Sequence, residues 1–412
     1  MKLLTTLLLT LCLGLASAAE KLNFVPLFNG KDLTGWKGEG YAVEDGAIVC
    51  TPKGKNLMTE ALYANYVLDF EFKLNDGSNN GLGIHYPGHG DPAYTGMEIQ
   101  VLDNTAKKYQ GKLKDYQWHG SIYTMVAAKK GHLKPVGEWN LQRVTVNGDE
   151  VSVELNGTII TKANLAELRE KFPKHEGVKR RSGHIAFCGH GDRVAYRAIR
   201  ICELSPHANV KGTLEAGFRP LFDGRSLEGW KGEAGFEKHW IATNGILKYD
   251  GKQKDLWTNK SYKDFTLAFD WRWTQTGPMV KRPVLGADGN PTGEQVDVQE
   301  LDSGVYLRGS SKSQVNLWNW PCGSGEVYGY RTDKKQSAEV RAGVTPLVAA
   351  DNPVGDWNRM LIQVKGDTLN VSLNGKQVLK NAKLPGMNPE GPIALQNHGA
   401  AIDFANLYIR ED

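Results

Sequence analysis

The sequence predicts an all-β protein made of two tandem β-sandwiches, and three observations support this prediction. The stretch 135–157 returns at 353–375 with twelve of its twenty-three positions identical, so the chain contains an internal repeat. Within each copy apolar residues alternate with polar ones, as at Val151, Val153 and Leu155, which is typical of an antiparallel strand with one buried face. A Gly-Asp turn separates the two runs of each copy and an Asn-Gly pair ends the second run, as is typical of hairpins.

The repeat extends over most of the chain and sets the expected domains. The stretch 24–36 matches 218–230, and 183–201 matches 391–409. Between the copies a polar segment with Pro and Gly lacks strand alternation, which is typical of a linker. We therefore expect a first domain over residues 22–203, a linker over 204–216 and a second domain over 217–412.

The first twenty residues predict an exported protein. They contain an early lysine, an apolar run and the small residues Ala16, Ser17 and Ala18, which together indicate a signal peptide over residues 1–18. Leu-Thr-Leu before Cys12 lacks the small residues of a lipoprotein signal. No later run approaches the roughly 20 apolar residues of a membrane helix. We expect a periplasmic or extracellular protein without a membrane span.

Charge and composition exclude one class of partner and favour another. The net charge is +4, and Lys and Arg are mixed with Asp and Glu along the chain, so we expect no nucleic-acid partner. Eleven Trp and fifteen Tyr favour stacking platforms for flat apolar ligand faces such as sugar rings, although core packing accounts for most of such residues. The four cysteines after the leader divide three to one between the copies, so we interpret them as buried small residues.

Three segments stand apart from the strand pattern. The stretch 164–171 predicts a helix with Asn164 as its N-cap. The charged run 174–181 predicts a solvated loop, and the Gly- and Pro-rich stretch 275–293 predicts a long surface loop.

Side-chain alternation predicts a polar face in the first domain. In the strand 81–86, Leu82, Ile84 and Tyr86 should share one face, which leaves His85 with two glycines on the other. In the strand 97–101 the apolar residues alternate with Glu98 and Gln100. If these strands are neighbours, His85, Glu98 and Gln100 lie on one open surface, where the glycines leave room for a ligand.

The second copy carries different groups at the same positions. Arg308 stands at the place of His85, and Gln314, Asn316 and Trp318 stand at the places of Glu98, Gln100 and Leu102. No carboxylate occupies the compared positions, so we predict that the first domain is catalytic and that the second binds saccharide. The ionisable set of the first domain is His85, His89, Asp91, Glu98, Asp103, His119 and His190. The expected binding set of the second domain is Tyr306, Arg308, Gln314, Trp318, Tyr328, Arg331, Gln396 and His398, where His398 matches His190.

Several commoner site types are absent from the sequence. No Ser-His-Asp order, phosphate loop or H-E-x-x-H pattern occurs. The stretch 85–91, HYPGHGD, is rich in metal-ligating residues but has no metal-site spacing. No cofactor is assigned, and a divalent metal stays an open alternative.

The motifs LFNGKDLTGW, VEDG, MEIQVLDN and PVGEWN, with the closing HG strand, resemble the 3-keto-disaccharide hydrolase family. The second copy resembles the same family through DSGVYLRG, GSGEVYGYRTD, PVGDWN and GPIALQNHG. Members of that family have a concanavalin-like, laminin-G-type jelly roll. The resemblance therefore implies two tandem concanavalin-like jelly-roll β-sandwiches, and a saccharide or 3-keto-saccharide as substrate.

The resemblance also implies a chemistry. A ketone at carbon 3 acidifies the C2 hydrogen, so a base can remove it and the aglycone oxygen can leave carbon 1, after which water adds. We expect His85 or Glu98 as the base, His119 or His190 as the acid or a metal ligand, and Gln100 and Tyr123 as groups that orient the sugar. Glu98 and Asp103 differ in strand parity and make a poor pair for a double-displacement glycosidase.

Two other classes of function remain compatible with the sequence. A tandem carbohydrate-binding protein without catalysis would also carry polar faces rich in Trp and Tyr. A structural surface protein would neither bind nor cleave sugar. At the level of single residues, Glu98 can equally be an ordinary solvated carboxylate, and Asp103 can simply cap a turn.

Overall fold

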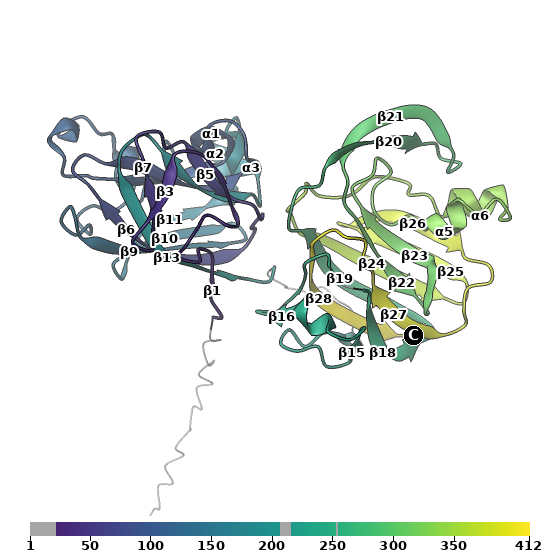
Figure 1. Ribbon diagram of the computed structural model, residues 1–412. Coiled ribbons are helices and arrows are strands. Elements are labelled where there is room, and N and C mark those ends of the chain that lie inside the picture. Colours follow the sequence, from purple (N-terminus) through teal and green to yellow (C-terminus); the bar gives the residue numbers. More distant parts are fainter. Residues whose placement is uncertain (1–21, 207–215, 253) are drawn as a thin grey trace, which may run out of the picture.

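The computed structural model describes residues 22–206, 216–252 and 254–412. It consists of two β-sandwiches that follow each other along the chain (Figure 1). The predicted signal peptide and most of the predicted linker lie outside the described residues, so both stay predictions.

The first sandwich packs an eight-stranded sheet against a five-stranded one. The eight-stranded sheet has the order β11-β10-β9-β6-β13-β4-β3, and β1 pairs with β13 at its side; the five-stranded sheet has the order β2-β5-β12-β7-β8. The larger sheet contains β1 (Val25–Pro26), β3 (Tyr41–Glu44), β4 (Ala47–Cys50), β6 (Tyr66–Leu74), β9 (Trp139–Asn147), β10 (Glu150–Leu155), β11 (Thr158–Asn164) and β13 (Val194–Glu203). The smaller sheet contains β2 (Trp36–Gly38), β5 (Asn56–Thr59), β7 (Asn79–Tyr86), β8 (Met97–Leu102) and β12 (His184–Gly189).

The second sandwich repeats this topology strand for strand. Its sheets have the orders β16-β17-β28-β19-β24-β25-β26, with β14 on β28, and β15-β18-β27-β22-β23. The larger sheet contains β14 (Arg219–Pro220), β16 (Trp240–Thr243), β17 (Ile246–Tyr249), β19 (Phe265–Trp273), β24 (Asn358–Lys365), β25 (Thr368–Leu373), β26 (Lys376–Lys383) and β28 (Ile402–Glu411). The smaller sheet contains β15 (Trp230–Lys231), β18 (Leu256–Tyr262), β22 (Asp302–Leu307), β23 (Ser310–Trp318) and β27 (Gly391–Leu395).

Each sandwich buries its own core between its two sheets, as the alternation of apolar residues predicts. In the first core the ring of Phe187 from β12 stacks on Tyr196 from β13 with centroids 3.9 Å apart. In the second, Trp240 from β16 stacks on Tyr249 from β17 at 4.1 Å. Trp36 and Trp230 are buried at equivalent places. The predicted all-β fold of two sandwiches is confirmed.

The repeated stretch forms the hairpins β9–β10 and β24–β25, as predicted. Asn156 and Asn374 take positive φ angles before the glycine that ends each repeat. Asn tolerates this left-handed conformation better than most residues, which explains why an Asn-Gly pair stands in both copies.

Among the residues that the structure describes, helices are few and short. They are α1 (Pro92–Thr95), α2 (Leu165–Lys171), α3 (Glu176–Lys179), α5 (Tyr328–Arg331) and α6 (Ala338–Gly343), with 3-10 turns η1 (Lys107–Tyr109), η2 (Asp115–Gln117) and η3 (Phe236–Lys238). The helix expected over 164–171 is confirmed, because the Asn164 side chain accepts hydrogen bonds from the main-chain N–H groups of Ala166 and Glu167. None of the described helices is long and apolar enough to cross a membrane.

Two loop predictions were wrong. The charged run 174–181 contains α3, which buries Val178. The stretch 275–293 belongs largely to an antiparallel hairpin of β20 (Met279–Leu285) and β21 (Pro291–Gln299), which stands out from the second sandwich as an arm (Figure 1). Its residues are mostly exposed, so the buried stripe from which a strand is normally inferred is missing.

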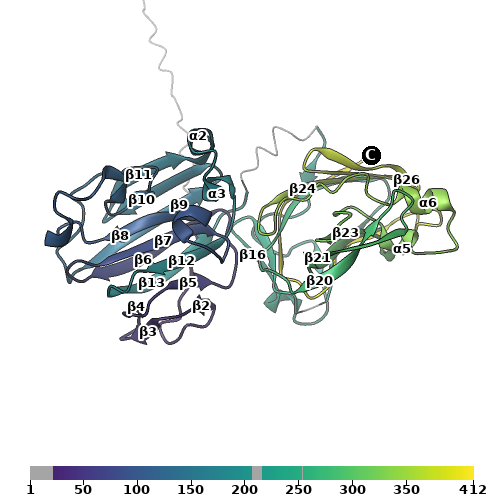
Figure 2. The same ribbon diagram turned by 90° about the horizontal axis from the view of Figure 1, so that it is seen from above.

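The two sandwiches contact each other through a buried ion-pair network. The Arg272 guanidinium is 2% exposed; it donates to Leu62 O at 2.9 Å and to Asp403 Oδ2 at 2.7 Å, and it also pairs with Glu203. Lys248 Nζ joins the network at 2.5 Å from Glu203. The two bodies lie side by side in both views (Figures 1 and 2).

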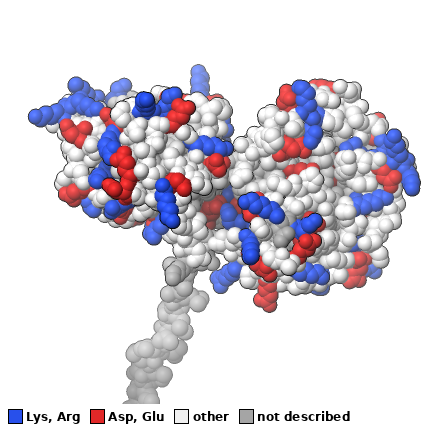
Figure 3. All heavy atoms as spheres, viewed as in Figure 1, with Lys and Arg blue, Asp and Glu red and all other residues white. Residues whose placement is uncertain are grey.

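The distribution of surface charge and the burial of the cysteines agree with what the sequence indicates. Lys and Arg are interspersed with Asp and Glu on the face shown in Figure 3. Cys50, Cys188, Cys202 and Cys322 are free; the first three are buried and Cys322 is half-buried.

Candidate functional site

The face of the five-stranded sheet that points away from the core of the first sandwich carries the candidate site; we name it the first open face. On β8, Met97, Ile99 and Val101 belong to the core, so Glu98 and Gln100 point to this open face, as predicted. A Cβ atom on Gly81 of β7 would lie 1.8 Å from Glu98 Oε1. The space left by the absent side chain at Gly81 is therefore filled by the Glu98 carboxylate and not by a ligand.

Glu98 forms an ion pair with His190. The Nε2 atom of His190 lies 3.7 Å from Glu98 Oε1, and the Glu98 side chain is 6% exposed whereas that of His190 is 49% exposed. The Oε1 atom is buried, and at 3.7 Å its contact with the His190 ring is longer than a regular hydrogen bond. Glu98 nevertheless raises the pKa of His190, because this weak hydrogen bond and the negative charge both favour the protonated ring. The pair thus combines a buried carboxylate with an imidazole that favours its protonated form.

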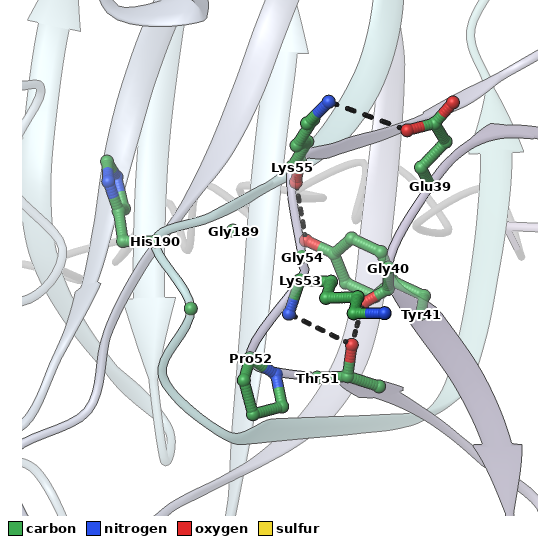
Figure 4. Close-up of a pocket in the computed structure, with 11 residues that line it drawn as sticks. Glu39, Gly40, Tyr41, Thr51, Pro52, Lys53, Gly54, Lys55, Gly189 and His190 are labelled. Atoms are coloured by element: carbon green, nitrogen blue, oxygen red, sulfur yellow. Dashed lines mark hydrogen bonds and ion pairs between the residues drawn. The ribbon is translucent and has the colours of Figure 1, made fainter.

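A pocket of about 670 Å³ opens beside His190. Its walls are the loops that follow β2, β4 and β12, and Figure 4 shows His190 on one side and Lys55 with Glu39 on the other. Lys55 Nζ lies 3.5 Å from Glu39 Oε2, and Tyr41 donates its hydroxyl to Lys55 O and Phe187 O. The pocket is large enough for a sugar unit next to the Glu98–His190 pair.

Aromatic side chains flank Glu98 near β8. The ring of Tyr116 stands edge-on to that of Tyr123 with centroids 6.1 Å apart, and the main-chain N–H of Tyr123 donates to Glu98 O at 2.8 Å. Tyr94 belongs to α1, which packs against β7 and β8, and Tyr94 is 52% exposed. The sequence analysis identified Tyr123 but missed Tyr94 and Tyr116, because both lie in segments without strand alternation.

The predicted orientation of His85 was wrong. The pairing of β7 with β12 shifts register between Gly83 and Tyr86, and His85 takes a φ of 51°. This β-bulge inserts one residue and reverses the alternation, so Tyr86 joins Ala186 and Cys188 on the first open face. His85 is 1% exposed, and burial lowers its pKa to about 4. It does not share a surface with Glu98.

His119 is also wrongly predicted as a site residue. Its ring stacks on Phe72 at 4.9 Å and lies 3.0 Å from Gln142 Oε1 inside the first core. Burial lowers its pKa to about 4. It is therefore a buried neutral histidine that no substrate on the first open face can reach.

Other members of the predicted ionisable set have structural contacts. Asp103 accepts hydrogen bonds from the main-chain N–H groups of Gly77 and Thr105, as a turn cap does. Asp91 caps α1 through Ala93 N, and the main-chain oxygen of His89 accepts from Thr95.

The equivalent surface of the second sandwich, the second open face, carries Gln314 at the place of Glu98. A Cβ on Gly304 would lie 2.4 Å from Gln314 Nε2, which is the same close approach as at Gly81. Gln314 donates to Gln396 Oε1 at 2.8 Å, and Tyr306 lies 5.7 Å from Trp257 between ring centroids. The predicted grouping of Gln314, Gln396 and Tyr306 is thus seen in the structure, and Trp257 is an addition.

Two predicted arginines of the second open face are engaged elsewhere. Arg308 repeats the bulge of His85 with a φ of 51°, and its guanidinium donates to Lys263 O, Gly366 O and Asp264. Arg331 pairs with the buried Glu326. Both charges are satisfied within the protein, so placing these arginines on the face was wrong.

Aromatic residues at the edge of the second open face differ in access. Trp318 is 2% exposed and donates its ring N–H to Gly323 O. Trp320 stacks on it at 4.2 Å and is only half-buried, and Tyr328 is 47% exposed. Trp320 and Tyr328 therefore offer the accessible rings, and Trp318 supports Trp320 from below.

His398 occupies the place of His190, as predicted, and it also faces a carboxylate. Its Nδ1 atom lies 3.4 Å from Asp302 Oδ2 on β22. Asp302 was not predicted, because the comparison of its strand with the strand of His85 used only Arg308 at the far end. The alternation of Asp302 with Gly304 and Tyr306 is the signal that places it on the second open face.

A metal site was left open by the sequence. Among the residues that the structure describes, no group of three or more His, Cys, Asp or Glu side chains could hold a metal ion.

Comparison with known proteins follows the same two-part division. The model of the 3-keto-alpha-glucoside-1,2-lyase-like domain matches residues 23–202 and again 217–410. A protein from Bacteroides thetaiotaomicron named 3-keto-disaccharide hydrolase is 26% identical, over 43% of this chain and 77% of its own length. Among solved structures, one candidate glycosyl hydrolase from Parabacteroides distasonis is 27% identical, with 44% of this chain and 94% of that chain covered and a TM-score of 0.40. A Bacillus subtilis protein with a galectin-like fold is 12% identical, with 45% and 97% covered and a TM-score of 0.32. Since the family model covers nearly all of both sandwiches, the chain belongs to the family of 3-keto-alpha-glucoside-1,2-lyase-like domains.

Proposed function

We propose that this protein is an exported carbohydrate-active enzyme that cleaves 3-keto-glycosides on its first open face, by elimination followed by hydration. Membership of the 3-keto-alpha-glucoside-1,2-lyase-like family supports the substrate class. The name of the Bacteroides thetaiotaomicron relative points the same way. The observation that carries the proposal is the Glu98–His190 pair, because it supplies both a base and an acid at one point of the sheet.

The two side chains have complementary roles in the elimination. Glu98 removes the proton from C2, and the C–H electrons move through the enolate of the C3 ketone to form the C1–C2 double bond. The C1–O bond then breaks, and protonated His190 gives its proton to the departing aglycone oxygen. Addition of water across the double bond yields the free 3-keto-sugar.

Burial suits Glu98 to this role. Its side chain is only 6% exposed and its Oε1 atom lies 3.7 Å from the acid His190, so the base and the acid are held together and are largely shielded from water. Gly81 leaves the space that the carboxylate occupies. Gln100 lies two residues further along the same strand, and Tyr94, Tyr116 and Tyr123 offer rings against which a sugar can stack.

The direct test compares a 3-keto-disaccharide with its unoxidised parent. The mature protein should release sugar only from the ketone. Glu98→Gln and His190→Ala should each lower kcat by about 100-fold or more, in the range of general acid–base catalysis. His132→Ala is the matched control, because His132 lies in the loop before β9 and its main-chain oxygen, not its ring, accepts a hydrogen bond from Asn156. Full activity in both site variants would refute this assignment.

A non-catalytic saccharide-binding protein is the second candidate. The accessible rings of Trp320 and Tyr328 on the second open face favour it. Under this alternative the protein binds the ketone and its parent with similar affinity, and neither is cleaved.

Export is the remaining part of the proposal and rests on residues 1–18. Cell fractionation should find the full-length protein outside the cytoplasm, and deletion of these residues should retain it inside.

A further inference from the structure

The second open face, like the first, carries a histidine that is paired with a carboxylate, although the carboxylate does not stand at the equivalent sequence position. A His-Gly pair lies in the loop after β12 and in the loop after β27. Both histidines face a carboxylate of their own sandwich: His190 faces Glu98 and His398 faces Asp302. The histidine is supplied by the same loop in both copies. The carboxylate comes from β8 in the first sandwich and from β22 in the second.

The second sandwich has a histidine–carboxylate pair without a glutamate at position 314, because its carboxylate belongs to the neighbouring strand. Gln314 occupies the position of Glu98 and binds Gln396 rather than His398. Asp302 stands opposite Trp318 in the sheet, whereas the equivalent pair in the first sandwich is Asn79 opposite Leu102. The carboxylate has thus moved by one strand, while the histidine has kept its place.

The surroundings of Asp302 are those of a recessed site and not of a surface ion pair. The Asp302 side chain is 17% exposed, whereas that of His398 is 56% exposed. Burial raises the pKa of Asp302 to about 6. A carboxyl group with this pKa changes its charge close to neutral pH, as a general base does.

The arm contributes a wall on this side of the second open face. Arg282 of β20 pairs with Glu300 at 2.5 Å and lies 4.7 Å from the ring centre of Trp320. Glu300 is two residues before Asp302, and its Oε2 atom is buried without a hydrogen-bond partner among the described residues. Trp320 is thereby held between Arg282 and Trp318, with its ring at the edge of the site.

We propose that the second open face is a second active site for 3-keto-glycosides, in which Asp302 is the base, His398 is the acid and Trp320 is the platform for the sugar or its aglycone. The inference rests on the proposed function, because it assigns the same elimination to a second place. Asp302 takes the C2 proton, the electron pair forms the C1–C2 double bond, the C1–O bond breaks, and His398 protonates the departing oxygen. Trp320 favours substrates with a flat apolar aglycone, which the tyrosines of the first face select less strongly.

The test uses the full chain and two ketones: a 3-keto-disaccharide and p-nitrophenyl 3-keto-glucoside, each as both anomers. Four single variants are compared with wild type, namely Glu98→Gln, His190→Ala, Asp302→Asn and His398→Ala, together with the double variant of Glu98 and Asp302. His132→Ala serves again as the matched control for loss of a histidine, and thermal unfolding checks that each variant is folded.

We expect that Glu98→Gln and His190→Ala still turn over at least one of the substrates. For that substrate, Asp302→Asn and His398→Ala should lower kcat at least tenfold. The double variant of Glu98 and Asp302 should be inactive. In the variants of the first face, the remaining rate should rise with pH through about 6, because Asp302 must lose its proton to act.

Three other results would overturn the inference, and they separate it from the proposed function. If variants of the first face lose all turnover while variants of the second leave every kcat unchanged, the second face is not catalytic and only the inference falls. If variants of the second face raise KM with kcat unchanged, it is a binding surface and again only the inference falls. If wild type cleaves no ketone, both fall. If only variants of the second face lose turnover, the inference stands and the first-face assignment falls.

Discussion

Replacing Glu98 by Gln should lower the pKa of His190, and the structure sets the size of this effect. The substitution keeps the shape of the side chain and removes its charge. At the observed 3.7 Å, Coulomb's law gives an attraction of about 1 kcal/mol in a water-like medium and about 4.5 kcal/mol at an effective dielectric constant of 20. His190 is half exposed, so solvent screening favours the lower value. The fall in the pKa of His190 should therefore reflect the loss of about 1 kcal/mol of attraction.

NMR titration of the histidine Cε1–H signals measures this shift directly. The chain has ten histidines, and His190→Ala identifies the signal of interest by its disappearance. Glu39→Gln is the matched control, because it removes a carboxylate from the opposite wall of the same pocket (Figure 4), where Glu39 is paired with Lys55.

An unchanged His190 pKa in Glu98→Gln would refute the pairing on which the proposed chemistry depends. An equal fall in Glu39→Gln would show that the general charge of the pocket, and not Glu98, holds the proton on His190. Neither outcome depends on knowing the substrate.

Three further changes have defined outcomes. Gly81→Ala should lower turnover by about 10- to 100-fold with little loss of stability, because its Cβ would lie 1.8 Å from Glu98 Oε1 and displace the carboxylate. Arg272→Met should lower the free energy of unfolding in urea by about 3–5 kcal/mol, because it leaves buried carboxylates without their main partner. The free energy of unfolding should fall as the pH drops from 6.5 towards 4, because His119 binds a proton in the unfolded chain but not in the native one, where its pKa is about 4. His119→Gln should remove on the order of 3 kcal/mol of this pH dependence. Urea unfolding at several pH values between 4 and 6.5 measures both effects.

Each of these changes has a control or a contrary result. Gly343→Ala meets nothing within 4 Å at its new Cβ and should leave turnover unchanged. Lys281→Met breaks an exposed pair with Asp297 and should cost less than about 1 kcal/mol; an equal loss from Lys281→Met and Arg272→Met would contradict the importance of burial. If His119→Gln unfolds with the same pH dependence as wild type, His119 is not neutral in the native state.

Much of the fold was predictable from the sequence, because a regular alternation reports directly on burial. The hairpins at 135–157 and 353–375 form as expected, and the alternation on β8 correctly places Glu98 and Gln100 on the first open face. The helix after Asn164 was predictable because its cap is local to the chain.

Features that depend on backbone irregularity or on distant segments were not predictable in the same way. Nothing in the residues around His85 marks the bulge that turns its side chain away. His119 is separated from its partner Gln142 by 23 positions, so its burial in the core has no local signal. Every strand residue of the arm at β20–β21 is at least partly exposed, and the Gly and Pro residues that favour a loop obscured its strands.

The bulge has a consequence for reading related sequences. Both sandwiches insert one unpaired residue at the same point, His85 in one and Arg308 in the other, each with a φ of 51°. Any residue that follows this point on the strand swaps sides relative to simple odd-and-even counting. Odd-and-even counting therefore assigns the inward-facing His85 and Arg308 to the ligand surface, and in the first sandwich it misses Tyr86, which lies there instead.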